Sequence, residues 1–471
     1  MRNCEHRADF TAEQIADACG GALCRGSGGT RAQGVSTDTR TLRCGEAFFA
    51  LRGPNHDGHD YLPEAVADGA PILVVDHWSP QDPPAVGASV VEVQDTTEAL
   101  LALAAWHRRR LSGTLIAVTG SYGKSTVKGM VGAVLGRAGR CTVAPASFNN
   151  RIGVARTLLA AGRSDDFVVL EMGTNHPGEV DELARAGRPH VGVITAIGEV
   201  HLEGLGSLAG VREAKAELIP WLSPDGALIL NADDLYCSPL RDCFAGRVLT
   251  FGNVPRADVR PTRVRRSGTG WAFDALDCSF HLTAGARYNV MNAAAALCAA
   301  LAVGVTPERA RQPLAAFRPP ALRYEVRTIG GIRFVLDCYN SNPPAMRAAL
   351  RSFLAEDAPG RKVVVCGDML ELGAEAPALH RQVGRELADA PIDAVVGVGK
   401  LSRHAIEGWH SRALPPRWAL WFADAEEACE PLGQRLRPGD AVLLKGSRAM
   451  RLETIADRMA EQQPGAGREA A

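Results

Sequence analysis

The chain has almost no net charge, although it contains 471 residues. Its 52 Lys and Arg residues are balanced by 53 Asp and Glu residues, which gives a formal charge of −1. A balance of this kind provides no extended positive surface for a polyanion. We therefore expect no nucleic-acid partner, and any phosphate group should be bound locally by particular loops.

Long hydrophobic runs and paired cysteines are also missing. Residues 1–6 lack the apolar stretch of a secretory signal, and runs such as Leu100–Trp106 are too short to cross a bilayer. The 12 cysteines include no CxxC pair, so reduced thiols are favoured over a zinc site or a disulfide framework. These absences predict a cytoplasmic protein that makes no membrane contact.

The length and the hydrophobic pattern predict an α/β protein of three domains. Residues 1–105 mix short strands with helices, residues 106–311 begin with a strongly apolar run, and residues 312–471 follow a junction that contains several prolines. Continuous apolar runs at Leu115–Thr119 and Val191–Thr195 are typical of a parallel sheet covered on both faces. We therefore predict a small α/β domain, a central parallel-sheet domain and a C-terminal domain.

The C-terminal region repeats a strand followed by a helical segment five times, which predicts a second doubly wound, Rossmann-like α/β domain. The predicted strands cover residues 333–337, 362–366, 394–398, 419–422 and 441–445.

A glycine-rich turn between a buried strand and a helix start is the strongest chemical signal. Residues 119–126 read Thr-Gly-Ser-Tyr-Gly-Lys-Ser-Thr, with the spacing GxxGKS, which is shorter than the common GxxxxGKS. Backbone N–H groups of such a turn converge on phosphate oxygens, and the helix N-terminus adds its positive end. An ordinary glycine-rich turn is the weaker alternative. The predicted nucleotide-binding residues are Gly120, Ser121, Gly123, Lys124, Ser125 and Thr126.

Two further side chains are expected at the same sheet edge. Glu171 follows the apolar run Phe167–Leu170, and His201 follows the strand at Val191–Thr195. Ligands of parallel α/β sheets bind outside the carboxyl ends of the strands. Glu171 could hold Mg²⁺ beside the Ser125 hydroxyl, while a helix-cap carboxylate and a structural histidine are the alternatives.

Lys215 falls on the apolar face of a predicted helix over residues 207–222. It lies between Val211 and Leu218, which should face the core. An inward lysine is costly unless it is paired or chemically modified. A lysine whose stem packs while its ammonium reaches solvent is an equally good interpretation of the pattern alone.

Taken together, these motifs resemble the Mur ligase family of peptidoglycan synthesis, and within it the MurF type. The resemblance covers nearly the whole chain, and the Tyr-Asn-x-Asn-Pro and Gly-Asp-Met-x-Glu-Leu-Gly stretches indicate the MurF type. The matching stretches are Ser36–Arg40, Asp57–His59, Thr119–Thr126, Asn149–Val154, Glu171–Asn175, His201–Glu203, Ala214–Glu217, Tyr288–Asn292, Asp337–Pro343, Gly367–Gly373 and Lys445–Arg448.

The resemblance implies an ATP-dependent amide ligase that forms ADP. It would join D-alanyl-D-alanine to a UDP-N-acetylmuramoyl-tripeptide through an acyl phosphate, with ATP and Mg²⁺ as cofactors. It further implies a UDP-binding N-terminal domain, a central ATPase-like domain, a C-terminal domain that closes over the site, and a monomer.

The resemblance also implies roles for individual residues. Lys124, His201, Lys215 and Arg323 would be catalytic, and Lys215 matches a lysine that is carbamylated in related ligases. The implied metal-site residues are Ser125, Glu171, His201 and Lys215. Asn289 and Asn292 would face adenine, and Asp337 the ribose. The implied substrate-binding residues are Thr37, Asp38, Thr39, Arg40, Asn150, Tyr339, Asn340, Lys445 and Arg448.

The sequence departs from the family pattern at a few positions. A bulky Tyr122 stands in the phosphate loop, and Leu336 replaces the first Asp of a usual pair, so that only Asp337 remains. None of the departures removes an essential chemical group. They leave open a paralogue that ligates another amino acid or dipeptide. A catalytically silent nucleotide-binding homologue is a second alternative, which is disfavoured because all of the candidate catalytic and metal-site residues are present together: Lys124, Glu171, His201, Lys215, Arg323 and Asp337.

Overall fold

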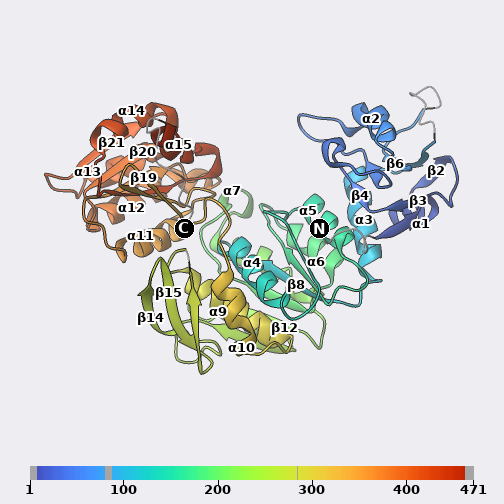
Figure 1. Cartoon of the computed structure of the whole chain (residues 1–471), viewed down its shortest axis with the longest axis horizontal. Helices are drawn as coiled ribbons and strands as arrows, with labels where there is room; N and C mark the ends of the chain where they lie inside the picture. The colour runs from blue at the N-terminus through green and yellow to red at the C-terminus, as the bar shows by residue number, and fades with distance from the viewer. Residues whose placement is uncertain (1–7, 80–86, 284, 462–471) are drawn as a thin grey trace.

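The computed structural model describes residues 8–79, 87–283 and 285–461, so residues 1–6 lie outside it. Three α/β domains follow one another along the chain, as the sequence predicts (Figure 1). The N-terminal domain is blue in this view, the central domain runs from green to yellow, and the C-terminal domain is orange and red. No helix within the described ranges combines the length and the hydrophobicity that a membrane crossing requires.

The N-terminal domain is built on a five-stranded sheet with the order β2-β7-β6-β5-β4. Strands β4 to β7 run parallel, and β2 is the antiparallel edge. The strands are β2 (Ala22–Arg25), β4 (Val35–Ser36), β5 (Ala47–Phe49), β6 (Ile72–Val75) and β7 (Ser89–Glu92), with a small pair formed by β1 (Asp9–Thr11) and β3 (Arg31–Gln33). The helices are α1 (Ala12–Cys19), α2 (Leu62–Ala67) and α3 (Thr96–Arg108).

The central domain contains a six-stranded, wholly parallel sheet with the order β13-β12-β11-β8-β10-β9. Its strands are β8 (Thr114–Thr119), β9 (Cys141–Val143), β10 (Phe167–Glu171), β11 (Val191–Ile194), β12 (Ala227–Asn231) and β13 (Arg247–Phe251). Its helices are α4 (Lys124–Leu135), α5 (Arg151–Ala160), α6 (Glu179–Gly187), α7 (Leu202–Leu205), α8 (Leu208–Ala216), α9 (Asn289–Ala302) and α10 (Pro307–Ala316). An antiparallel sheet that the sequence analysis did not predict adds β14 (Thr262–Ser267), β15 (Gly270–Ala275) and β16 (Cys278–Leu282).

The C-terminal domain confirms the predicted fivefold alternation. Its sheet has the order β17-β18-β22-β19-β20-β21, in which all pairs are parallel except β17 with β18. The strands are β17 (Glu325–Ile329), β18 (Ile332–Leu336), β19 (Lys362–Gly367), β20 (Ala394–Val398), β21 (Trp418–Phe422) and β22 (Ala441–Lys445). The helices are α11 (Pro343–Leu354), α12 (Ala376–Asp389), α13 (Ser402–His410), α14 (Ala425–Arg435) and α15 (Glu453–Glu461).

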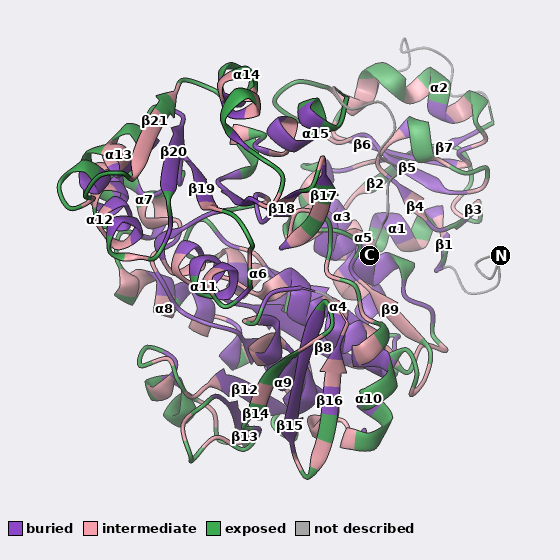
Figure 2. Cartoon of the chain, turned by 60° about the vertical axis from the view of Figure 1, so that its left-hand side comes forward, coloured by how far each residue is buried: buried purple, intermediate pink, exposed green. Residues whose placement is uncertain are grey.

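Inner strands of both large sheets are buried on both faces, which explains their continuous apolar sequences. β20 is purple along its length in Figure 2, which marks buried residues, and β8 and β19 are buried after their first residue. Helices cover both faces of such a sheet, so a strand has no solvent side on which polar residues could alternate. The polar residues that could bind a ligand therefore lie in the loops that follow the strands.

Two details of the fold differ from the sequence-based expectations. The predicted helix over 207–222 is too long, because α8 ends at Ala216 and a short 3₁₀ turn, Ile219–Trp221, follows. Pro220 disfavours the helical conformation of the residue before it and cannot continue the hydrogen-bond ladder. The predicted division points after residues 105 and 311 also fall inside helices α3 and α10.

Candidate active site

A cavity of about 1030 Å³ lies between the central and C-terminal domains. The phosphate loop, Glu171 and His201 line it from the central domain, where the carboxyl ends of β8, β10 and β11 meet. The lining residues from the region after residue 316 include Arg323, Asp337, Tyr339, Asn340 and Lys445. The structure thus brings together predicted residues that are more than 300 positions apart in the sequence.

The phosphate loop connects β8 to the N-terminus of α4. Gly120 and Gly123 have φ values of 136° and 84°, and a Cβ atom on Gly120 would lie 2.1 Å from Thr195 Oγ1. Only glycine therefore fits this turn. No side chain caps α4, so its first N–H groups are free to bind an anion. The loop has the form of a cradle for phosphate groups.

Lys124 folds back over this loop, and its Nζ donates a hydrogen bond to Gly120 O at 2.6 Å. Burial lowers the pKa of Lys124 to about 8; the neighbouring Glu171 carboxylate opposes this shift, and Arg323 adds to it. When a buried amine lies near another cation, a bound anion stabilises its charged ammonium form. The position therefore suits a residue that pairs with phosphate.

Glu171 lies at the end of β10 and is almost fully buried, with 1% of its surface exposed. Its Oε1 accepts hydrogen bonds from Ser125 Oγ at 3.1 Å and from Asn149 Nδ2 at 3.0 Å. Its Oε2 lies 3.3 Å from Lys128 Nζ. The predicted neighbourhood of Glu171 and Ser125 is present, whereas Asn149 and Lys128 were not predicted as site residues.

His201 has a positive φ of 50°, and its Nδ1 contacts the carboxylate of Glu371 from the C-terminal domain. Burial lowers the pKa of His201, and the positive charges of Lys124 and Lys215 act in the same direction, while Glu371 opposes them. A neutral imidazole is the form that binds metal ions. Glu371 lies in the Gly-Asp-Met-x-Glu-Leu-Gly stretch, but no sequence pattern indicates its contact with His201.

Lys215 is fully buried on α8, as its place on the apolar face predicts. Its Nζ has no hydrogen-bond partner among the residues that the structure describes. Burial holds the pKa of Lys215 well below its usual value, and Lys124 lowers it further. The interpretation in which the ammonium reaches solvent is therefore wrong, and the amine is held in a state that favours modification or pairing with an added group.

Two side chains bridge the domains at the phosphate loop. Arg323 Nη2 donates to Ser125 Oγ at 3.4 Å, and its guanidinium lies 4.3 Å from the centroid of the Tyr339 ring. The Tyr339 hydroxyl in turn donates to Ser147 Oγ of the central domain at 2.7 Å. The C-terminal domain is thus seated against the loop that would hold ATP.

Lys445 lies at the centre of the hydrogen bonds on the side of the cavity that the C-terminal domain forms. Its buried Nζ donates to the backbone oxygens of Asp337 at 3.0 Å and Asn340 at 2.6 Å, and lies 3.4 Å from Asp337 Oδ2. Burial lowers the pKa of Lys445, and the Asp337 carboxylate opposes that shift. Lys445 therefore fixes the loop that carries Asp337 and Asn340, and its contact with a dipeptide stays a prediction.

The residues predicted near adenine form a hydrogen-bonded pair. Asn292 Nδ2 donates to Asn289 Oδ1 at 2.9 Å, and Asn292 lines the cavity. Asn289 Nδ2 is buried without a hydrogen-bond partner among the described residues. An unmet donor of this kind is available to an acceptor on a ligand.

Several predicted substrate residues lie elsewhere or already have partners. Asn150 lines the cavity, but its Oδ1 caps α5 by accepting from Gly153 N at 2.9 Å. Arg448 is outside the cavity lining and contacts the Glu453 carboxylate. Thr37, Asp38, Thr39 and Arg40 follow β4 in the N-terminal domain and are also absent from this lining. Asp38 and Arg40 form an ion pair of 2.7 Å.

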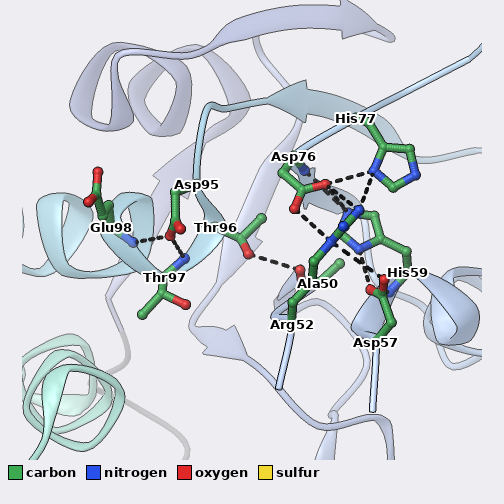
Figure 3. Close-up of polar contacts among 10 residues, drawn as sticks. All are labelled: Ala50, Arg52, Asp57, His59, Asp76, His77, Asp95, Thr96, Thr97 and Glu98. Carbon is green, nitrogen blue, oxygen red and sulfur yellow. Dashed lines mark hydrogen bonds and ion pairs between the residues drawn. The ribbon is translucent and has the colours of Figure 1, made fainter. Parts of the chain in front are cut away.

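A separate polar cluster follows β5 and β6 in the N-terminal domain (Figure 3). His59 Nδ1 lies 2.6 Å from Asp57 Oδ1, and the ligand atoms of His59, Asp76 and His77 are close enough together to hold a metal ion. However, Arg52 Nη2 lies 3.0 Å from both Asp76 Oδ1 and His77 Nδ1. Because this guanidinium already supplies a positive charge, the cluster is a self-paired network and we assign no metal to it.

The central site fits Mg²⁺ and ATP on its own chemistry. Ser125 and Glu171 place oxygen donors side by side at the phosphate loop, and hard oxygen ligands suit Mg²⁺. The tight glycine turn at Gly120 and Gly123 and the uncapped start of α4 suit phosphate. Lys215 would complete this set only after it gained an anionic group.

Comparison with known proteins relates the whole chain to one family. The family models described as the Mur ligase family, catalytic domain, the Mur ligase middle domain, and the Mur ligase, glutamate ligase domain match residues 31–108, 118–300 and 322–448. The UDP-N-acetylmuramoyl-tripeptide–D-alanyl-D-alanine ligase of Bacillus subtilis is 34% identical over 431 residues, covering 91% of this chain and 93% of that protein. Its namesake from Escherichia coli is 35% identical over 444 residues, with coverages of 91% and 93%.

Solved structures show the same relationship. A crystal structure of MurF from Acinetobacter baumannii is 30% identical and has a TM-score of 0.87, covering 97% of this chain and all of the other. MurF ligase from Thermotoga maritima in complex with ADP is 25% identical and has a TM-score of 0.77, covering 91% of this chain and 97% of the other.

Proposed function

The chain belongs to the Mur ligase family, and we propose that it joins D-alanyl-D-alanine to a UDP-N-acetylmuramoyl-tripeptide at the expense of ATP. The reaction is an amide ligation that produces ADP and phosphate and supplies a peptidoglycan precursor. The single observation that carries this proposal is the cavity in which Arg323 and Tyr339 meet the phosphate loop and its neighbour Ser147.

The first step converts an unreactive carboxylate into an acylating agent. An oxygen of the tripeptide's terminal carboxylate attacks the γ-phosphorus of ATP, the bond to the β-phosphate oxygen breaks, and ADP leaves. Lys124 and Arg323 contact the phosphate loop from the central and the C-terminal domain, and they would stabilise the negative charge of the transferring group. Ser125, Glu171 and His201 would hold Mg²⁺, and the bound ion would supply positive charge against the phosphate groups.

In the second step the amine of the dipeptide attacks the acyl carbon. The tetrahedral intermediate then expels phosphate, and the nitrogen loses a proton. An acyl phosphate is destroyed by water, so the site must be closed while the intermediate exists. The bridges from Arg323 to Ser125 and from Tyr339 to Ser147 hold the domains together at the place where this closure is needed.

We also propose Mg²⁺ as the metal, carbamylation of Lys215, and a monomeric, cytoplasmic enzyme. The buried, unpartnered amine of Lys215 supports its reaction with CO₂, in which the nitrogen bonds to carbon and releases a proton, leaving a carboxylate on the side chain. Sedimentation analysis of the purified protein tests the oligomeric state.

A substrate panel tests the function directly. Purified protein with ATP and Mg²⁺ is offered UDP-muramyl peptides of different length, each with D-alanyl-D-alanine or with single amino acids, and phosphate release is measured. We expect rapid release only with a UDP-muramyl-tripeptide and a D-amino-acid dipeptide together. Release with another amine would identify a paralogue, and ATP binding without stimulated release would identify a silent homologue.

A further inference from the structure

Lys128 is a buried lysine to which the mechanism above gives no role. It lies one helical turn after Lys124 on α4, so the two side chains share a face of the helix. Only 5% of its surface is exposed. Burial lowers the pKa of Lys128, and the Glu171 carboxylate opposes this shift. Burying a lysine costs free energy, and its contacts should offset this cost.

The contacts of Lys128 divide the two oxygens of Glu171 between different groups. Oε2 faces Lys128 Nζ at 3.3 Å, while Oε1 faces the Ser125 hydroxyl at 3.1 Å. Asn149 also donates to Oε1, at 3.0 Å. One oxygen therefore points toward the phosphate loop, and the other is engaged by a positive charge.

The ammonium is itself fixed by a second contact. Lys128 Nζ donates to the backbone oxygen of Ala146, a residue with an unusual positive φ of 41°. The same loop carries Asn149, which donates to Glu171 Oε1, so this loop contacts both Lys128 on α4 and Glu171 on β10. Lys128 Nζ is therefore held between Glu171 Oε2 and the backbone of this loop.

We propose that Lys128 is a positioning residue that reserves Oε2, so that Glu171 offers a single oxygen to a divalent cation at the phosphate loop. This inference rests on the proposed function, because it assumes the cation site of the ligase. Mg²⁺ takes six ligands in a strict octahedron, whereas Ca²⁺ accepts more ligands and often binds both oxygens of one carboxylate. Holding Glu171 to one oxygen therefore favours Mg²⁺ over Ca²⁺, in the manner of a group that orients a metal ligand.

The test measures nucleotide binding with two cations. The affinity of the full chain for ADP is determined by calorimetry in MgCl₂ and in CaCl₂, and the ratio of the two dissociation constants is compared between variants. Lys128→Met removes the charge while it keeps the length of the side chain. We expect it to shift the ratio toward Ca²⁺ by about fivefold or more. Lys128→Arg, which keeps a cation beside Oε2, should retain the preference for Mg²⁺.

Lys362→Met is a matched control, because Lys362 also donates to a backbone oxygen, that of Leu354 at 3.0 Å, but is not among the residues that line the cavity. It should leave the ratio unchanged. Should Lys128→Met fail to fold, Lys128→Gln removes the charge but keeps a donor for Ala146, and the same shift is expected. A folded, uncharged variant with the wild-type ratio would overturn the proposal. Failure of the wild-type protein to bind ADP with Mg²⁺ would instead refute the proposed function.

Discussion

The hydrogen bond between Tyr339 and Ser147 provides a quantitative test of domain closure. Tyr339 belongs to the C-terminal domain and Ser147 to the central domain, and their hydroxyl oxygens are 2.7 Å apart. Tyr339→Phe deletes this bond but keeps the ring beneath the Arg323 guanidinium, 4.3 Å from the ring centroid. Ser147→Ala deletes the same bond from the other side.

A neutral hydrogen bond contributes about 0.5–1.5 kcal/mol. If the bond is made in the closed state where reaction occurs, its loss lowers kcat/KM by roughly 2- to 12-fold, since about 1.4 kcal/mol corresponds to a factor of ten. Each single variant should show this reduction. The double variant should be no worse than the singles, because both changes remove one interaction.

The assay is phosphate release at subsaturating UDP-muramyl-tripeptide, with kcat/KM determined for the four proteins of the cycle. Tyr339→Leu serves as a further comparison, because it also removes the cation–π contact of Arg323, which adds about 0.5–2 kcal/mol. It should lose more activity than Tyr339→Phe. Fully additive losses in Tyr339→Phe and Ser147→Ala would show that the two hydroxyls do not meet during catalysis.

Three further predictions concern the phosphate loop and the buried lysines. Lys124→Ala should lower kcat by about 100-fold or more while circular dichroism stays unchanged, because the charge on the transferring phosphoryl group loses a fixed partner; near-normal turnover would reject the assignment of the loop. ADP binding, measured by calorimetric titration, should weaken as the pH rises through about 8, the pKa to which burial lowers Lys124. Above this pH the free enzyme loses the ammonium that attracts phosphate. Lys124→Arg should show no such weakening, because its guanidinium stays charged. Lys215→Ala should lower kcat by about 100-fold or more, and added formate should restore part of the activity by placing a carboxylate in the vacated space. Mass spectra should show a CO₂ adduct on the native chain only. A fully active variant would contradict a role for Lys215.

Features that depend on local sequence could be predicted. The turn at Gly120–Gly123 was identified because only glycine tolerates its backbone and because an apolar strand and a helix flank it. The C-terminal strands were found for the same reason, since buried parallel strands are apolar throughout. The place of Lys215 on the apolar face of its helix could be predicted from periodicity, whereas the burial of its amine could not, because the pattern leaves open whether the ammonium reaches solvent.

Features that depend on tertiary contacts could not be predicted. Strand β14 reads Thr-Arg-Val-Arg-Arg-Ser and is mostly exposed, so it shows no apolar signal of its own. The contact of His201 with Glu371 joins residues 170 positions apart in different domains. Lys128 offered one local clue, its spacing of four from Lys124, but Glu171 and Ala146 become its neighbours only after the sheet has formed.

The transfer of oxygen from the tripeptide to phosphate tests the central claim most directly. A UDP-muramyl-tripeptide labelled with oxygen-18 in its terminal carboxylate is incubated with ATP, Mg²⁺, D-alanyl-D-alanine and the enzyme, and the products are analysed by mass spectrometry. The account predicts one labelled oxygen in each phosphate released and a peptide lengthened by the dipeptide. Unlabelled phosphate alongside the lengthened peptide would contradict activation of the carboxylate by the γ-phosphate.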